Sequence, residues 1–172
     1  MLQEIQESRR TLFEYARRAG FLRTDSVNYP NQKVSCNPMI SERYRNCNGV
    51  VLLGDGVAGC SHYDMNDKSF YDYLDKLVLD TSRANDWNDL GAILIGGDVY
   101  HFSRNLGILR QLRIPVFGSY CDGWPEDTVT GTKAERKRKG YHEKSLVVIP
   151  CTKEVFLDLD GENILKLHPL LA

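Results

Sequence analysis

The sequence predicts an α/β (α+β) fold, a layered sandwich in which mixed β-sheets are flanked by helices. Two observations favour this class. Short apolar runs of strand type alternate with amphipathic helical stretches from residue 49 onward. The first two runs are close enough to form a hairpin, whereas the later runs are separated by helices, and such crossovers require parallel pairing. We therefore expect both antiparallel and parallel strand pairs.

The length and composition are those of one globular domain spanning residues 1–172. A chain of 172 residues can bury a single core, and its 42% hydrophobic and 26% charged residues are ordinary for a globular protein. The net charge of -1 provides no overall field that would attract nucleic acid or an anionic membrane. No apolar run approaches the roughly eighteen residues of a membrane span. We expect neither nucleic-acid binding nor membrane insertion.

The cysteines indicate a reducing compartment. The chain has five cysteines: Cys36, Cys47, Cys60, Cys121 and Cys151. Their odd number and irregular spacing are unlike a disulfide framework or paired zinc ligands. The N-terminal residues mix acids and bases without an apolar stretch, so no secretory signal is predicted. The expected location is the cytoplasm, with all five thiols reduced.

The first half of the chain begins with an expected amphipathic helix over Gln3–Ala19. Residues Asn28–Asn48 are rich in Asn, Ser and Pro, which predicts irregular backbone with room for one short strand. A hairpin, a helix and a buried strand should follow, over Gly49–Leu53 paired with Val57–Tyr63, then Phe70–Leu79, then Leu90–Ile95.

The second half continues the alternation of helix and strand. Ser103 is the expected cap of a helix that runs through Leu112, and a strand should begin at Ile114–Phe117. The basic run Lys133–Lys139 is predicted to be a solvated loop. The last expected elements are the two strands of a hairpin, Leu146–Ile149 and Val155–Leu157.

Cys47 and His62 form the sharpest chemical pattern. They lie fifteen positions apart (62 − 47), and the predicted hairpin can bring their side chains together across neighbouring strands. A thiol with a pKa of about 8.5 is mostly protonated at neutral pH, so a nucleophilic cysteine needs a neighbour, and an imidazolium can stabilise the thiolate. The residues alone leave open the ordinary alternative of a buried thiol and a packed histidine.

A second interpretation places a metal on the same hairpin. The period of two along a strand puts Cys60, His62 and Asp64 on one face. Zinc usually takes four ligands, or three and a water, and no clear fourth ligand lies nearby. Gly96-Gly97 lacks the other residues of a phosphate-binding loop and indicates a tight turn. We expect neither a metal nor a cofactor.

Residues 41 to about 159 resemble the bacterial chemoreceptor glutamine deamidase family CheD. The resemblance rests on a Cys before an apolar strand, a turn, a strand that ends in Cys-Ser-His, and then two helix–strand units. The matching stretches are Cys47, Val57–His62, Ala92–Gly97 and Ile114–Phe117. That family is related in fold and site to the catalytic domain of cytotoxic necrotizing factor toxins. Residues 1–40 lie outside the resemblance.

The resemblance implies a hydrolase of the chemotaxis system that converts a protein glutamine to glutamate and ammonia. The implied substrate is a receptor helix, and a regulatory protein is an implied possible partner. Cys47 would be the nucleophile and His62 its base. The family carries a Thr or similar residue shortly before the Cys, and Ser41 lies six positions before Cys47. Tyr44-Arg45-Asn46 replaces the family's small residues there. That change leaves a second hypothesis, a non-catalytic protein-binding module with the same fold.

Overall fold

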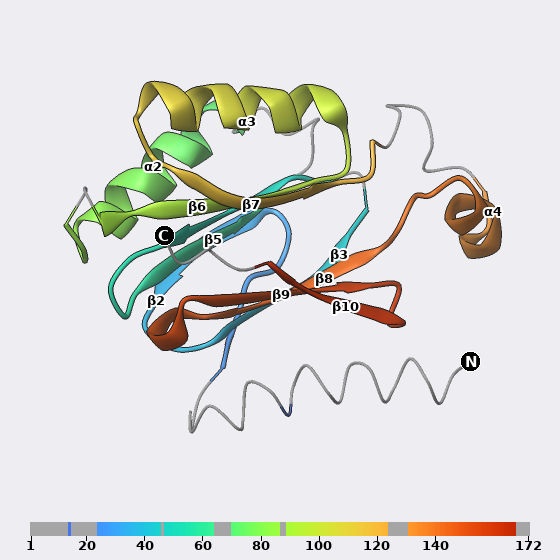
Figure 1. Cartoon of the computed structure of the whole chain (residues 1–172), viewed down its shortest axis with the longest axis horizontal. Coiled ribbons are helices and arrows are strands. Elements are labelled where there is room, and N and C mark those ends of the chain that lie inside the picture. The colour runs from blue at the N-terminus through green and yellow to red at the C-terminus, as the bar shows by residue number, and fades with distance from the viewer. Residues whose placement is uncertain are drawn as a thin grey trace.

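The computed structural model describes residues 14, 24–45, 47–63, 70–86, 89–123 and 131–167. Two five-stranded sheets lie face to face, and two helices cover one of them (Figure 1). The predicted α+β sandwich with mixed sheets is therefore confirmed. The elements in chain order are β1 (Asp25–Ser26), β2 (Asn31–Ser35), β3 (Met39–Tyr44), β4 (Gly49–Leu53), β5 (Ala58–His62), α2 (Phe70–Ser82), β6 (Gly91–Gly96), α3 (Val99–Gln111), β7 (Val116–Cys121), α4 (Lys133–Arg138), β8 (Lys144–Ile149), η2 (Pro150–Thr152), β9 (Glu154–Leu159) and β10 (Asn163–Leu167).

The helix-covered sheet has the strand order β2-β5-β4-β6-β7. Its β4–β5 hairpin is antiparallel, as the sequence predicts, and β6 and β7 are parallel because α3 crosses over between them. Helices α2 and α3 pack on its outward face, where their apolar residues join those of β4 and β6 in one buried cluster. The predicted alternation of helix and strand thus builds this half of the protein.

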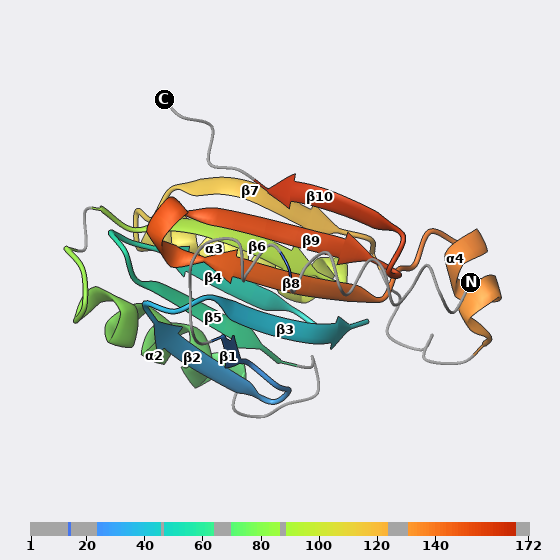
Figure 2. The ribbon, with the colours of Figure 1, turned by 90° about the horizontal axis from the view of Figure 1, so that it is seen from below.

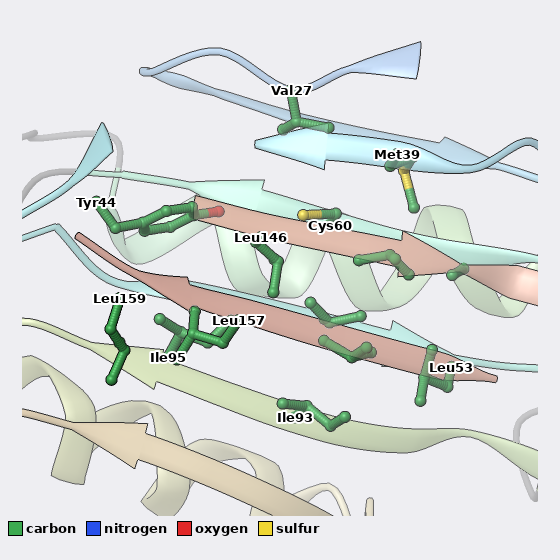
Figure 3. Packing of buried hydrophobic residues seen from close by; sticks show 14 residues of the cluster. Val27, Met39, Tyr44, Leu53, Cys60, Ile93, Ile95, Leu146, Leu157 and Leu159 are labelled. Carbon is green, nitrogen blue, oxygen red and sulfur yellow. The ribbon is translucent and has the colours of Figure 1, made fainter. Parts of the chain in front are cut away.

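The second sheet, called here the outer sheet, has the order β1-β3-β8-β9-β10. Figure 2 shows β10, β9, β8 and β3 side by side in this sheet. The β8–β9 hairpin was predicted, and η2 joins its strands. Between the two sheets lies a core of buried side chains, among them Met39, Tyr44, Cys60, Ile95 and Leu146 (Figure 3). This inter-sheet core is the layer into which Cys47 and Ser41 also point.

A bulge in β3 determines which of its side chains reach the inter-sheet core. Met39 and Ser41 pair with Val148 and Leu146, but the register shifts by one residue before Tyr44 pairs with Lys144. In a regular strand, residues three apart face opposite sides. The extra residue, together with the left-handed backbone of Arg43 (φ 67°), puts Ser41 and Tyr44 on the same face.

Several sequence predictions are corrected. Residues 28–48 contain two strands rather than at most one, because β2 is a polar edge strand and β3 carries its bulge in a charged stretch. Helix α3 begins at Val99, where Asp98 and not Ser103 is the N-cap and accepts a hydrogen bond from the His101 amide. The basic run forms α4 rather than a loop, because Thr132 and Glu135 make a capping box.

The last strand, β10, was not predicted. It is exposed along most of its length, so no apolar alternation marks it in the sequence. The expected helix over Gln3–Ala19 lies outside the described residues, apart from residue 14. Among the described residues, no helix is long and apolar enough to cross a membrane.

Candidate functional site

The β4–β5 ladder brings Cys47 and His62 to one end of the inter-sheet core. Val51 pairs with Cys60, and an isolated bridge joins Asn48 to Tyr63, so the same register places Gly49 opposite His62. Cys47, two residues before Gly49, packs against the inter-sheet core. Extended by one more pair, this register would make Cys47 and His62 diagonal neighbours, a relationship that spans about 7–8 Å between Cα atoms. No hydrogen bond joins Nε2 of His62 to Cys47 or to any other described residue.

Ser41 fixes the tautomer of His62. The Ser41 hydroxyl donates its only hydrogen to the carbonyl oxygen of Val27 at 2.6 Å, and its oxygen lies 3.1 Å from Nδ1 of His62. Because the hydroxyl hydrogen is already used, Nδ1 must carry a hydrogen and donate it to Ser41. The other ring nitrogen, Nε2, is then a bare acceptor. The predicted contact between Ser41 and His62 is present in the structure.

The Nε2 atom of His62 is buried and has no hydrogen-bond partner among the described residues. Leaving such an acceptor unpaired costs about 1–3 kcal/mol, so a native protein rarely does so without a reason. A role as a proton acceptor for a reacting group is one such reason. The whole His62 residue is 1% exposed.

Tyr44 holds the ring of His62 from one side. The two rings are stacked with centroids 3.7 Å apart and planes at 12°, and the Tyr44 hydroxyl donates to the Ser61 carbonyl at 2.7 Å. Burial raises the pKa of Tyr44, so its phenol stays neutral and remains a donor. A Cβ atom at Gly49 would lie 2.7 Å from the Tyr44 ring, so glycine is required there for Tyr44 to reach His62.

Burial also determines the charge of His62. It lowers the pKa of His62 from 6.5 to about 4, because the charged ring would lose its hydration. At neutral pH the ring is therefore neutral, which corrects the expectation of an imidazolium beside Cys47. A neutral ring with a bare Nε2 can accept a proton from a thiol, so the geometry favours general-base assistance over a resting ion pair.

The low pKa of His62 predicts a pH dependence of stability. Between the folded pKa of about 4 and the unfolded value of 6.5, the unfolded chain binds more protons, so lowering the pH destabilises the fold. The expected loss attributable to His62 is about 3 kcal/mol across this window. It should disappear in His62→Asn, measured by urea unfolding at about pH 7 and about pH 4.5. An equal pH dependence in both proteins would show that His62 is not buried in its neutral form.

The metal interpretation receives no support from the donor set. Cys60 is fully buried among the apolar side chains of the inter-sheet core. Nδ1 of His62 is engaged with Ser41. Asp64, the third predicted member, lies outside the described residues. Within the described part of the chain, no group of three or more His, Cys, Asp or Glu residues is arranged to hold a metal.

Other residues at this end of the core were not linked to Cys47 by any signal in the sequence. The Gly97 amide donates to the Cys47 carbonyl at 3.0 Å, which ties the segment of Cys47 to the end of β6. Asp98, next in the chain, accepts from the Asn48 side chain at 2.5 Å and from the His101 ring at 2.9 Å. The turn at Gly96-Gly97 thus leads into α3 and also anchors the main chain at Cys47. No spacing rule would have connected these residues in advance.

Comparisons with known proteins add no relative to this picture. No protein-family model matches the chain, and a search of curated proteins finds no match. The likeness to chemoreceptor deamidases is therefore carried only by the residues quoted above.

Proposed function

We propose that the protein is a cysteine-dependent protein glutamine deamidase, with Cys47 as nucleophile, His62 as general base and acid, and Ser41 as the residue that orients the ring. The observation that carries the proposal is the buried, unpaired Nε2 of His62. Ser41 fixes the tautomer of the ring, and Cys47 packs against the inter-sheet core at the same end of the β4–β5 hairpin. This arrangement has the three roles of an activated nucleophile: an attacking group, a base and an orienting group.

The proposed reaction has two halves. The Cys47 sulfur attacks the side-chain amide carbon of glutamine while Nε2 of His62 takes the thiol proton. The C–N bond then breaks, His62 returns the proton to the departing ammonia, and a thioester remains. Water attacks the thioester carbon while His62 takes a proton from it. Cleavage of the C–S bond then releases the glutamate side chain, and His62 returns the proton to the departing sulfur, which restores the thiol. The resting state needs no charge on His62.

Main-chain amides near Cys47 would stabilise the oxyanion in the proposed mechanism. The Asn48 amide is not one of them, because it already donates to the Tyr63 carbonyl at 2.8 Å. We place the reaction in the cytoplasm, where all five cysteines, which are free in the structure, would stay reduced. The substrate we propose is a protein, with a chemoreceptor-type helix as its class.

The direct test is mass spectrometry of a soluble chemoreceptor helical fragment incubated with the protein, with free glutamine as the small-molecule control. Conversion of a glutamine to glutamate with matching ammonia release is expected for the fragment and not for free glutamine. Binding of the fragment without any conversion would instead support the non-catalytic binding module.

A further inference from the structure

Lys144, the first residue of β8, is a fully buried cation beside the candidate site. Its side chain is 0% exposed and that of its partner Asp122 is 2% exposed. The ammonium donates to both Asp122 carboxylate oxygens at 2.9 and 2.8 Å, to the Arg45 carbonyl at 2.9 Å and to the His142 carbonyl at 3.0 Å. All of its hydrogens are thus directed at acceptors within the protein.

These acceptors come from separate chain segments that meet at one end of the inter-sheet core. Arg45 lies two residues before Cys47, Asp122 follows β7, and His142 precedes β8. The Arg45 side chain adds a second tie to the same region, donating to Glu143 at 2.9 Å. The contacts of Arg45 hold the chain before Cys47, the proposed nucleophile, and the hydrogen bond from the Gly97 amide holds the carbonyl of Cys47 itself.

Stability alone is a poor explanation for this arrangement. Removing two charges from water costs several kcal/mol per ion, and a buried pair often contributes no more stability than apolar residues of the same volume. Here burial lowers the pKa of Lys144, and the Asp122 carboxylate opposes that shift. Unlike an apolar pair, Lys144 and Asp122 supply a directed hydrogen bond to the main chain just before Cys47.

We propose that Lys144 is a positioning residue for Cys47: its ammonium, held by Asp122, fixes the Arg45 carbonyl and so places the Cys47 sulfur in register with His62. This inference rests on the proposed function, because it assigns Lys144 a role in the same reaction. Lys144 does not contact the substrate. It acts through the main chain that leads into the nucleophile.

The test compares the alkylation of Cys47 with that of Cys36, an exposed thiol in the same chain. The variant Lys144→Met/Asp122→Leu removes both buried charges, so no unpaired ion remains. Lys144→Gln is a second variant, which keeps a donor for Asp122 but is too short to reach the Arg45 carbonyl. Lys33→Met is the control for loss of a lysine from an ion pair elsewhere in the fold, because Lys33, which is partly exposed, pairs with the buried Asp25 at 2.9 Å.

With iodoacetamide at about pH 7 and below each melting temperature, the wild type and Lys33→Met should alkylate Cys47 faster than Cys36, because His62 can accept the thiol proton as the sulfur attacks. In folded Lys144 variants the ratio of the two rates should fall to about one, because the thiol loses its placement against His62. A purely structural role would lower the melting temperature and leave the ratio unchanged.

The outcomes separate the two proposals. A high ratio in the wild type that persists in a folded Lys144 variant overturns the positioning role and leaves the proposed function standing. A ratio near one in the wild type removes the proposed function, and the positioning role with it. If the double variant does not fold, Lys144→Gln decides.

Discussion

Replacing His62 with alanine is expected to lower ammonia release from a glutamine-bearing protein by about a hundredfold to ten-thousandfold. Without the ring, the Cys47 thiol has no proton acceptor and the departing ammonia has no proton donor. Ser41→Ala should lower the rate of ammonia release less, because Ser41 only fixes the tautomer and orientation of the ring through its hydrogen bond to Nδ1. The measurement is the initial rate of ammonia release from the same substrate for the three proteins.

The His62→Ala variant must first be shown to fold, because His62 packs against Tyr44 in the core. Circular dichroism and a cooperative melting transition must match those of the wild type. His62→Asn provides a second check, since its amide can still donate to Ser41 but supplies no base. A folded variant that deamidates at the wild-type rate would contradict the mechanism, and the binding-module hypothesis would then account better for the protein.

Replacing Cys47 with alanine should have the largest effect, a loss of at least about a thousandfold that leaves only background ammonia release. The physical reason is that the thioester cannot form at all. The matched control is Cys121→Ala. Cys121 is also part-buried, but its sulfur donates to the Asp98 carbonyl at 3.7 Å and burial raises its pKa.

Acid quenching of the wild type during turnover should trap the substrate on Cys47, detected as a modified peptide. Wild-type activity in Cys47→Ala, or an adduct on another cysteine, would contradict the assignment. Loss of activity in Cys121→Ala with normal folding would indicate that a second thiol takes part.

The sequence predicted the parts of the fold that have a simple period. The β4–β5 hairpin, α2, β6 and the β8–β9 hairpin all combine apolar runs with turn residues, and their burial follows that pattern. The register that sets Gly49, two residues after Cys47, opposite His62 could be predicted because it depends only on one hairpin. Placing Ser41 near His62 required the family resemblance, since the two residues lie on different sheets.

The remaining features of the site depend on long-range geometry. Tyr44 reaches His62 only because of the bulge in β3, and no glycine marks the left-handed residue Arg43. Lys144 and Asp122 belong to two chain segments and lie 22 positions apart, so no local spacing connects them. The charge of His62 follows from its burial, which depends on the packing of both sheets.

The most direct test of the central claim, that Cys47 and His62 act as one chemical unit, is a partial-labelling time course with iodoacetamide at about pH 7, read for every cysteine by mass spectrometry. Cys47 should be modified faster than the other four thiols, including the exposed Cys36 and Cys151, because in the proposed mechanism His62 accepts the proton of the Cys47 thiol. Labelling of Cys47 no faster than that of Cys36 or Cys121 would contradict the account.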